Sequence, residues 1–298
     1  MNGVLVVDKP VGITSQIVIS AVRRVTGERR VGHCGTLDPL ASGVLPVMVG
    51  KATKACEFLM DHEKTYTASV RLGITTDSED VTGQILTTYD GPLPSFEDFR
   101  AAAESFVGEI EQSPPMYSAL KQNGQKLVDL ARQGITVERA SRKVTIHSIR
   151  AYEQDGSFLL DVHCSRGTYI RTLCADIGKL LGCGACMSAL RRTSVGQFSL
   201  AQSIPLDKLR TYSPEQAEAS LIPLEQLFAH LPTVTLPPFF ARLYGNGERI
   251  ALDKLRSVFP QGVQKGVLYR VYTPDGRFTL GEATEWNRNP VFSAKIFF

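Results

Sequence analysis

An aspartate placed in a tight turn constrains this chain more than any other feature of its sequence. Pro39 follows Asp38 and biases it towards an extended backbone. Gly35 and Gly43 lie on either side, where they permit close chain approach or positive φ angles. The apolar run Val44 to Val49 predicts a buried strand, so Asp38 would project from a loop anchored on a sheet. A carboxylate displayed in this way is a candidate functional group.

Four further segments accompany the Asp38 segment (Gly35 to Lys54) in order along the first two-thirds of the chain. They are Asp8-Lys9-Pro10-Val11-Gly12-Ile13-Thr14-Ser15, Lys64-Thr65-Tyr66, Pro114-Pro115-Met116-Tyr117-Ser118-Ala119-Leu120-Lys121 with Gly124, and Ser165-Arg166-Gly167-Thr168-Tyr169-Ile170-Arg171-Thr172. A lone Leu-Asp-Pro would be weak evidence, since turns commonly place Asp before Pro. Together the five segments resemble the signature of the TruB-type pseudouridine synthases, which isomerise uridine in the TΨC loop of transfer RNA.

This resemblance implies a fold and a domain organisation. The fold class is α+β, with the pseudouridine synthase fold: a mixed, mostly antiparallel sheet with flanking helices and a catalytic cleft. Residues 1–230 would form the catalytic domain, and residues 231–298 would form a small PUA-like β-barrel that contacts RNA. The PUA-like assignment rests mainly on the position of this unit in the chain.

The implied reaction converts uridine at position 55 of transfer RNA into pseudouridine. It breaks the N1 glycosidic bond, rotates the freed uracil and joins C5 to the same sugar, with no net redox change, so no cofactor and no metal are expected. It requires a nucleophile or a general base at the sugar, a pocket that holds the detached uracil, and access to a nucleotide stacked in the loop. Asp38 can supply the first requirement by attacking the sugar or the uracil ring, and both routes stay open.

Arg171 and Tyr66 would complete this chemistry. An Arg171 guanidinium within about 4 to 6 Å of Asp38 would favour the ionised carboxylate and could hold it bidentately, so we expect a buried ion pair at the cleft floor. The resemblance implies that Tyr66 stacks on the uracil and is a candidate proton shuttle. From the residues alone, Arg171 could equally be an exposed helix residue and Tyr66 a packed strand residue.

Three more residues are implied to bind the substrate. His33 matches a family histidine that occupies the space left by the flipped nucleotide. Leu190 matches an apolar residue that lines the uracil pocket. Tyr169 would pack against Arg171 and the base, although it could also be a core aromatic. The chain departs from the family at Val128, where Tyr is frequent, so one packing or stacking contact is not carried over.

The composition permits this interpretation without requiring it. With 298 residues, 43% hydrophobic and 21% charged, the chain is long enough for two globular domains. No segment resembles a signal peptide or a membrane span, and six irregularly spaced cysteines indicate a reducing compartment, so we expect a cytoplasmic protein. Cys183 and Cys186 have metal or redox spacing, but no second close pair accompanies them. We expect a monomer, although the sequence itself does not determine the oligomeric state.

Charge is distributed unevenly along the chain. Residues 1–60 carry 7 basic and 4 acidic groups, residues 61–119 carry 3 and 11, and residues 120–200 carry 12 and 6. The basic excess therefore falls in the segments that hold Asp38 and Arg171. This is expected if that face meets phosphates and the acidic block lies elsewhere, although a solvated surface of mixed charge would explain the charge pattern equally well.

Local patterns predict the main elements of the first 200 residues. They are a strand at Val4–Val7, a helix at Ser15–Val25 with Thr14 or Ser15 as N-cap and Gly27 past its end, a helix at Ser95–Val107 stopped by Gly108, strands at Lys143–Glu153 and Ser157–Cys164 joined by Asp155-Gly156, and a helix capped by Thr168.

The last third of the chain has a different character. Prolines between Ile204 and Pro238 indicate connecting structure with weak helical stretches. Short strands are then predicted at Val267–Thr273, Phe278–Glu282 and Val291–Phe297, with Asp275-Gly276 as a turn.

Three other functions compete with the one that the family resemblance implies. A nucleotide-binding P-loop is suggested by Gly50-Lys51, but Leu45 and Ala52 occupy positions where that motif needs Gly and Ser or Thr. A non-catalytic RNA-binding module would be favoured only if Asp38 or Arg171 were missing. A guide-dependent relative would differ in its extensions and tail, so we expect a stand-alone enzyme with transfer RNA as partner and no guide RNA.

Overall fold

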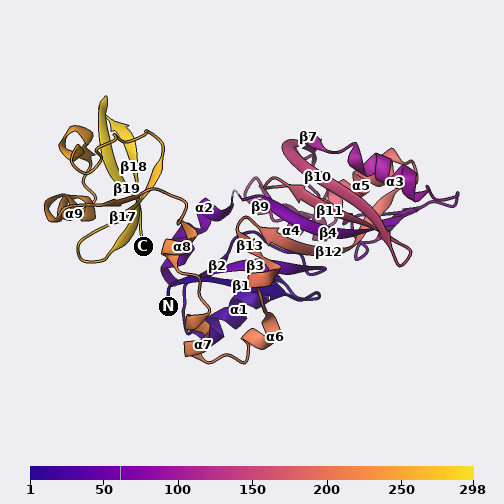
Figure 1. The fold of residues 1–298 in the computed structure, drawn as a ribbon. Coiled ribbons are helices and arrows are strands. Elements are labelled where there is room, and N and C mark those ends of the chain that lie inside the picture. The colour runs from indigo at the N-terminus through magenta and orange to yellow at the C-terminus, as the bar shows by residue number, and fades with distance from the viewer. Residues whose placement is uncertain (61) are drawn as a thin grey trace.

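The computed structural model describes residues 1–60 and 62–298, which form a large mixed sheet and a smaller C-terminal sheet (Figure 1). The large sheet has ten strands in the described residues and follows the order β14-β1-β3-β12-β4-β11-β10-β7, with β13 beside β12 and β2 beside β3. Its strands are β1 (Gly3–Lys9), β2 (Val31–His33), β3 (Ala41–Val49), β4 (Lys64–Leu72), β7 (Gly108–Gln112), β10 (Arg142–Gln154), β11 (Ser157–Cys164), β12 (Ala185–Val195), β13 (Phe198–Ser199) and β14 (Ile204–Pro205).

Strand β12 joins the two halves of this sheet. It pairs in parallel with β3 and antiparallel with β4, with Leu190 opposite both Ala41 and Ala68. Apart from the parallel pairs β12–β3 and β1–β14, the pairings are antiparallel, as predicted for a mixed, mostly antiparallel sheet. The sequence patterns did not predict β12, although it is the strand on which the cleft depends.

Helices cover the apolar face of this sheet and enclose the core. Helix α1 (Ser15–Thr26) packs near β1 and β3, α3 (Phe96–Glu104) lies against β10, and α5 (Ile170–Leu180) lies mainly against β12 with further contact to β4. The core between helices and strands includes Leu45, Leu160 and Leu173, each 0% exposed. No helix in residues 1–60 and 62–298 is both long and apolar enough to span a bilayer.

The predicted ends of α1 are confirmed and those of two other helices are corrected. Thr14 accepts a hydrogen bond from the amide of Ile17, and Gly27 ends α1 with a φ of 68°. Helix α3 ends at Glu104, so the prediction of a helix to Val107 was too long; Gly108, with a φ of 118°, instead opens β7.

Tyr169 occupies the N-cap position of helix α5 and makes no side-chain capping bond, so the prediction of Thr168 as the cap was wrong. The Thr168 hydroxyl donates to the carbonyl of Ser165 at 3.0 Å, so it is directed away from the helix. The side chain of Gln112 accepts from the Tyr169 amide at 3.0 Å and donates to the Tyr169 carbonyl, also at 3.0 Å. A residue from β7 therefore fixes the backbone of Tyr169, directly before the helix.

The predicted hairpin is confirmed. Asp155 and Gly156 adopt φ angles of 51° and 71° between β10 and β11, as a two-residue hairpin turn with two left-handed positions requires. The remaining elements before the smaller sheet are η1 (Gly50–Ala55), α2 (Cys56–Met60), β5 (Ile74–Thr76), β6 (Ile85–Thr88), β8 (Lys121–Gln122), β9 (Gln125–Lys126), α4 (Leu127–Arg132), η2 (Leu200–Gln202), α6 (Leu206–Leu209), α7 (Pro214–Ala219) and α8 (Leu224–Leu227).

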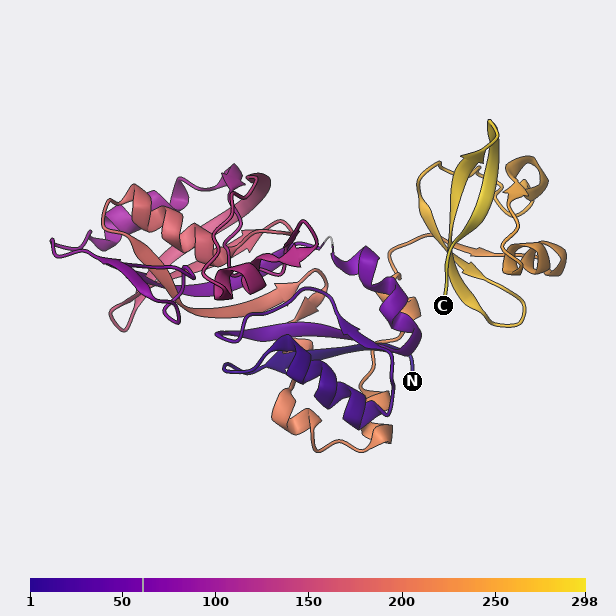
Figure 2. The same cartoon turned by 180° about the vertical axis from the view of Figure 1, so that it is seen from behind.

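The C-terminal unit is a curled five-stranded sheet (Figure 2). Its elements are β15 (Thr233–Thr235), α9 (Pro238–Gly245), β16 (Ile250–Ala251), η3 (Leu252–Leu255), β17 (Leu268–Tyr272), β18 (Phe278–Trp286) and β19 (Asn289–Phe297), with strand order β15-β17-β18-β19-β16. The three longer strands were predicted, whereas β15 and α9 were not. The chain passes between the two sheets after α8, and the division into residues 1–230 and 231–298 stays a prediction.

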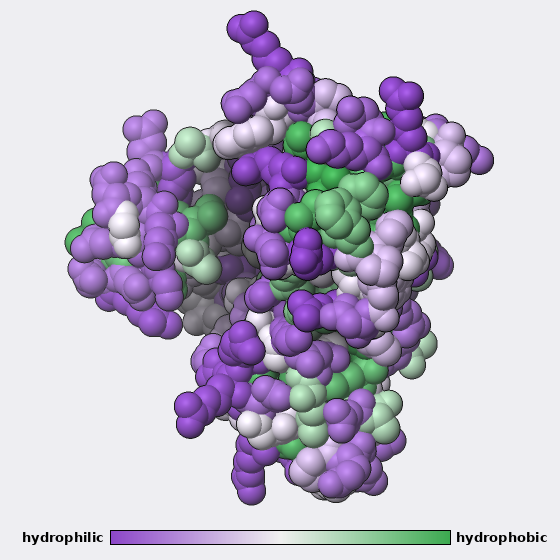
Figure 3. All heavy atoms as spheres, turned by 90° about the vertical axis from the view of Figure 1, so that its left-hand side faces the viewer, coloured by the Kyte–Doolittle hydropathy of each residue, from purple (hydrophilic) through white to green (hydrophobic). Residues whose placement is uncertain are grey.

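Aromatic side chains connect the C-terminal unit to the large sheet. The ring of Phe228 lies 5.9 Å from that of Phe298, and the ring of Phe298 lies 5.5 Å from that of Phe278. These residues belong to or pack against an apolar cluster that also contains Val4 and Met48 of β1 and β3. The surface seen in Figure 3 is mainly hydrophilic with smaller apolar patches, so the large apolar side chains are mostly used inside such clusters.

Candidate active site

A cavity of about 690 Å³ opens where the loop before β3, strands β4 and β12, and the start of α5 meet. Five of the six predicted site residues line it: Asp38, Tyr66, Tyr169, Arg171 and Leu190. These residues come from segments that are far apart in the sequence, and the large sheet brings them together. The shared cavity makes their predicted roles geometrically possible, and each role stays a prediction.

Hydrogen bonds to its backbone groups hold the loop that carries Asp38 in place. The hydroxyl of Ser15 donates to the carbonyl of Leu37 at 3.0 Å and accepts from the amide of Leu37 at 2.9 Å. The amide of Gly12 donates to the carbonyl of Pro39 at 2.8 Å. The Asp8 to Ser15 segment and the Asp38 segment are therefore parts of one structure. The Asp38 side chain is 40% exposed and lines the cavity.

Arg171 lies beneath this carboxylate in the first turn of α5. Its side chain is only 5% exposed, and its Nη2 lies 3.0 Å from Oδ2 of Asp38. Nη1 donates to the carbonyl of Ser78 and Nη2 to the carbonyl of Tyr117, each at 2.8 Å. The predicted ion pair therefore forms, between Nη2 of Arg171 and Oδ2 of Asp38. Because Asp38 is open to the cavity, only the arginine half of the pair is buried.

Asp80 is a second carboxylate beside Arg171, and sequence reasoning missed it. Its Oδ2 lies 3.7 Å from Nη1 of Arg171. Oδ1 accepts hydrogen bonds from the hydroxyl of Ser78 at 2.9 Å and from the amide of Thr82 at 2.9 Å. The charge pattern predicts that the acidic block of residues 61–119 lies away from the site, and Asp80 contradicts that expectation. Its position within a dense acidic block gave no local signal of a role.

Tyr66 and Leu190 form an apolar wall of the cavity. Tyr66 lies on β4 and is 7% exposed, and Leu190 lies on the neighbouring β12 and is 9% exposed. Burial raises the pKa of the Tyr66 phenol above its usual value, although the charge of Arg192 opposes this shift. The phenol is therefore protonated at neutral pH and can donate a proton or a hydrogen bond.

Tyr169 stands at the cavity edge with its backbone fixed by Gln112. The guanidinium carbon of Arg142 lies 4.8 Å from the centre of the Tyr169 ring, a cation–π arrangement. The expected packing of Tyr169 against Arg171 stays a prediction, and the ring contact with Arg142 was not predicted. The reason is the strand order: β10, which begins with Arg142, passes next to β7 and the start of α5.

His33 is the predicted residue that does not line the cavity. It lies in β2, opposite Val47 of β3, two residues before Gly35. Its Nδ1 is buried and has no hydrogen-bond partner among the described residues. Burial lowers the pKa of His33, and the nearby charge of Arg192 lowers it further, so the neutral imidazole is favoured.

The cavity lining is strongly basic. Besides Asp38, its charged residues are Lys64, Lys126, Arg142, Lys143, Arg166, Arg171 and Arg192. Burial lowers the pKa of Lys64, and the adjacent Arg192 lowers it further. An anionic ligand would relieve the repulsion among these groups, which is the physical basis for expecting phosphates at this face.

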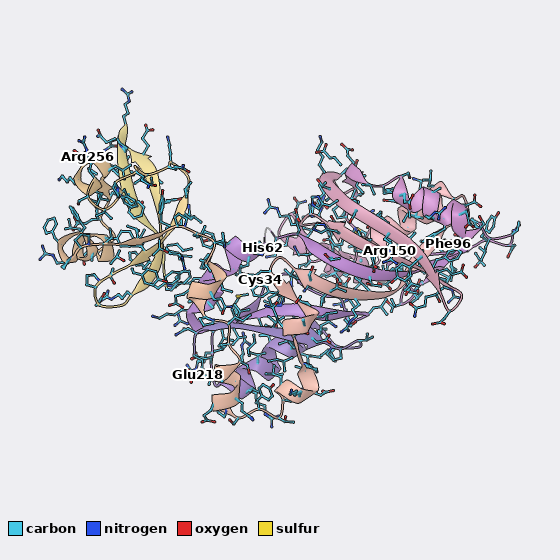
Figure 4. The ribbon with its side chains drawn as sticks, in the orientation of Figure 1. Cys34, His62, Phe96, Arg150, Glu218 and Arg256 are labelled. Carbon is cyan, nitrogen blue, oxygen red and sulfur yellow. The ribbon has the colours of Figure 1, made fainter. Side chains whose placement is uncertain are left out.

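The cysteines of the described residues do not form a metal centre. Cys183 and Cys186 are free and buried, and Cys186 is a core residue of β12. No group of three or more His, Cys, Asp or Glu side chains within residues 1–60 and 62–298 could hold a metal ion. Cys34, directly before Gly35, is labelled near the middle of the molecule in Figure 4, and its Sγ lies 3.0 Å from that of Cys56.

Comparisons with known proteins agree with this geometry. The family model described as the N-terminal domain of TruB family pseudouridylate synthase matches residues 23–170, and the model of the tRNA pseudouridylate synthase B C-terminal domain matches residues 171–229. The chain is 43% identical over 288 residues to tRNA pseudouridine synthase B of Clostridium perfringens (strain 13 / Type A), covering 96% of each chain. It is 46% identical over 251 residues to the protein of the same name from Alkaliphilus oremlandii (strain OhILAs), covering 84% of this chain and 83% of that one.

Solved structures share the fold. A chain in the crystal structure of a Cbf5-Nop10-Gar1 complex matches with a TM-score of 0.71 and 28% identity, covering 99% of this chain and 84% of that chain. A chain in the structure of an H/ACA RNP bound to a substrate RNA containing 2'-deoxyuridine matches with a TM-score of 0.70 and 26% identity, with the same coverage. The expected pseudouridine synthase fold is therefore confirmed, and the curled C-terminal sheet is consistent with a PUA-like unit.

Proposed function

Because this chain belongs to the TruB family and is a tRNA pseudouridine synthase that isomerises uridine to pseudouridine, we propose that it acts at position 55 in the TΨC loop and that Asp38 carries the reaction. One observation supports the role of Asp38 above all. Its carboxylate faces a basic cavity and lies 3.0 Å from a buried arginine that is anchored on backbone carbonyls. A reactive anion there is both stabilised and accessible.

The chemistry uses groups of this chain and the substrate alone. The N1–C1′ bond breaks, the uracil rotates, C5 bonds to C1′, and the proton lost from C5 is balanced by one gained at N1. Asp38 acts as nucleophile, at the sugar or at the ring, or as base, and Arg171 stabilises its charge between these steps. The protonated phenol of Tyr66 is the candidate group for moving a proton.

The uridine has to leave its stack to reach Asp38. Extruding a nucleotide costs a few kcal/mol, and stacking a base on an aromatic ring contributes about 1–3 kcal/mol. Tyr66 and Leu190 offer an apolar wall for the uracil beside Asp38. Base flipping into this cavity is therefore energetically feasible, with contacts to the RNA backbone supplying the remainder.

Those backbone contacts come from the basic residues of the cavity. Lys126 and Lys143 at its rim would meet phosphates of the TΨC arm, and the C-terminal unit would extend the RNA surface as a PUA-like domain. His33, beside the catalytic loop, would contact the RNA loop rather than the reacting uracil. Replacing either lysine with alanine should weaken the salt dependence of RNA binding, because fewer counterions are then released from the phosphates.

We further propose that the enzyme acts as a monomer, in the cytoplasm, without a guide RNA. The chain spans 96% of the length of tRNA pseudouridine synthase B from C. perfringens but 84% of the Cbf5 chain, which is named as part of a complex with Nop10 and Gar1. The free cysteines are compatible with a reducing compartment.

An assay with purified protein and an unmodified transfer RNA transcript tests these proposals together. With no guide RNA, cofactor or metal added, pseudouridine should form at position 55 and at no other uridine of the TΨC arm. A transcript carrying cytidine at position 55 is the matched control. Product at another position would refute the site assignment, and product only after addition of a guide RNA would refute the stand-alone proposal. RNA binding without product would indicate a binding module instead.

A further inference from the structure

Arg192 is the largest side chain that the structure buries completely among the described residues. It lies on β12, is 1% exposed, and borders the cavity between the Asp38 loop and Tyr66. Burying a guanidinium costs several kcal/mol unless hydrogen bonds and charges compensate it. The contacts of this side chain therefore show what its burial achieves.

Those contacts are made to the backbone of the catalytic loop and the following strand. Nε donates to the carbonyl of Val44 at 2.8 Å, Nη2 to that of Gly35 at 3.1 Å, and Nη1 to that of Thr36 at 3.4 Å. Gly35 and Thr36 precede Asp38 by three and two residues. No carboxylate of the described residues lies within 4 Å of Arg192, so it is not held by an ion pair.

Glycines make room for this arrangement. At Gly43 a Cβ atom would lie 2.1 Å from the carbonyl oxygen of Arg192, so β3 and β12 approach each other at a distance that only glycine permits. At Gly35, where φ is 90°, a Cβ would lie 3.5 Å from Nη1 of Arg192. Gly35 and Gly43 thus leave room for Arg192, which lies about 150 residues later in the chain.

From these contacts we propose that Arg192 is a positioning residue, which holds the loop that presents Asp38. Arg171 forms an ion pair with the carboxylate of Asp38, whereas Arg192 donates hydrogen bonds to the main chain that carries it. The two arginines therefore restrain the same residue at two different points. This inference rests on the proposed role of Asp38.

A planar guanidinium suits this task better than an ammonium. Its N–H groups form a fork of fixed geometry, which can reach three carbonyls in different directions at once, whereas lysine is a point charge on a flexible stem. The charge of Arg192 also lowers the pKa of Tyr66, in opposition to the effect of burial. Loss of the fork should release the loop without removing any group that reacts.

The test compares Arg192→Lys and Arg192→Gln with Arg191→Lys as the matched control. Arg191 is the next residue on β12, but it bonds Asp8 at 2.7 Å and Ser42 at 3.3 Å and does not line the cavity. For each variant we would measure the single-turnover rate at saturating transfer RNA, the dissociation constant for transfer RNA, and amide hydrogen exchange of residues 35–38.

In the Arg192→Lys variant we expect a single-turnover rate about 100-fold below wild type, since displacing a reacting group by about 1 Å can cost that much. The dissociation constant for transfer RNA should stay within about threefold of the wild-type value, and amide hydrogen exchange of residues 35–38 should become faster. The control should match wild type in all three measurements. The Arg192→Gln variant, which removes the buried charge, makes the same test of the loop if the lysine variant does not fold.

Two results would overturn the proposal. An unchanged rate with faster global unfolding would make Arg192 structural only, and a loss confined to the dissociation constant would make it an RNA contact. The exchange measurement needs no activity, so it separates failure of this inference from failure of the proposed function. If Asp38→Asn left the enzyme active while Arg192→Lys freed the loop, the role of Asp38 would be refuted and the role of Arg192 as loop support would stand.

Discussion

The cavity region and the C-terminal sheet bury different kinds of side chain. Five charged residues are buried in the described part of the large-sheet region, and all of them lie within residues 1–200: Lys9, Lys64, Asp80, Arg171 and Arg192. In the C-terminal unit no charged side chain of the described residues is buried, and its buried hydroxyls include those of Thr273, Thr279 and Tyr244. Its core is aromatic instead, and the ring centre of Phe292 lies 6.0 Å from that of Tyr244 and 5.9 Å from that of Tyr269.

The two regions are therefore stabilised differently. The cavity region depends on directional hydrogen bonds to buried charges, and the C-terminal sheet depends on apolar packing. Apolar packing is non-directional and tolerates small shifts, whereas a buried charge must keep each of its hydrogen bonds or lose several kcal/mol. Arg171, for example, contacts two backbone carbonyls and two carboxylates. Buried charges thus occur around the cavity, where the proposed function needs reacting groups in defined positions. Five predictions test this contrast, from the largest expected effect to the smallest.

Removing the charge of Asp38 should have the largest effect. Asp38→Asn keeps the shape of the side chain but removes the anion, so the single-turnover rate should fall at least about 1000-fold with transfer RNA binding retained. The control is Asp161→Asn, which changes a carboxylate that accepts from Thr67 at 2.6 Å outside the cavity. Turnover within tenfold of wild type would remove Asp38 from the chemistry.

Tyr66→Phe should separate stacking from proton transfer. The ring is kept, so transfer RNA affinity should change less than about threefold, whereas loss of the hydroxyl should slow the rate about 100-fold or more if it moves a proton. Rate and affinity are measured on the same preparations under single-turnover conditions. An unaltered rate would discard the proton role.

Arg171→Lys should reduce the single-turnover rate about 100-fold. Lysine keeps the charge but cannot contact Asp38 and the carbonyls of Ser78 and Tyr117 with one planar group. Arg150→Lys is the control, because Arg150 is exposed on β10 near Tyr152, away from the cavity. Full turnover in Arg171→Lys would show that the pairing with Asp38 is not needed.

Asp80→Asn should have a smaller effect, of about tenfold on the rate. An asparagine oxygen still accepts from Ser78 and Thr82, but the charge 3.7 Å from Arg171 is lost, so the guanidinium is held less firmly. The exposed Asp90, changed to Asn, controls for removal of a surface charge. A rate equal to that of the Asp90 variant would mean that Asp80 plays no part in placing Arg171.

Phe292→Leu should alter stability but hardly alter catalysis. Phe292 is completely buried, and the smaller side chain should cost about 1–2 kcal/mol of unfolding free energy, lowering the melting temperature by a few degrees. The rate at saturating transfer RNA should stay within twofold of wild type. A tenfold loss of rate would erase the contrast between the two regions.

The sequence predicts the parts of this molecule that local signals control. Helix α1 has its capping threonine and its terminal glycine, and the Asp155-Gly156 turn defines the β10–β11 hairpin, so both were predicted correctly. The Asp38 loop was recognisable because Pro39 restricts the backbone of Asp38 and Gly35 permits the positive φ angle of 90° found there. These features depend on residues within a few positions of one another.

The parts that depend on distant partners were missed. Strand β12 shows no strict alternation because its pairing with β4 shifts register after Met187 and after Arg192. Its neighbours β3 and β4 lie more than one hundred residues earlier in the chain. Folding brings Asp80 next to Arg171 and brings Arg192 next to the Asp38 loop. Both contacts join residues far apart in the sequence, so no local pattern could identify them.

The central position of β12 also bears on how the enzyme folds as it is synthesised. A nascent chain that has emerged only to residue 184 already contains β1, β3, β4 and β11, yet it lacks the strand that pairs with both β3 and β4. We therefore expect the loop around Asp38 to remain open to protease on ribosome-stalled chains of that length, and to become protected once residue 195 has left the exit tunnel. The proposed active centre would then be among the last parts of the large sheet to form, although Asp38 is made early.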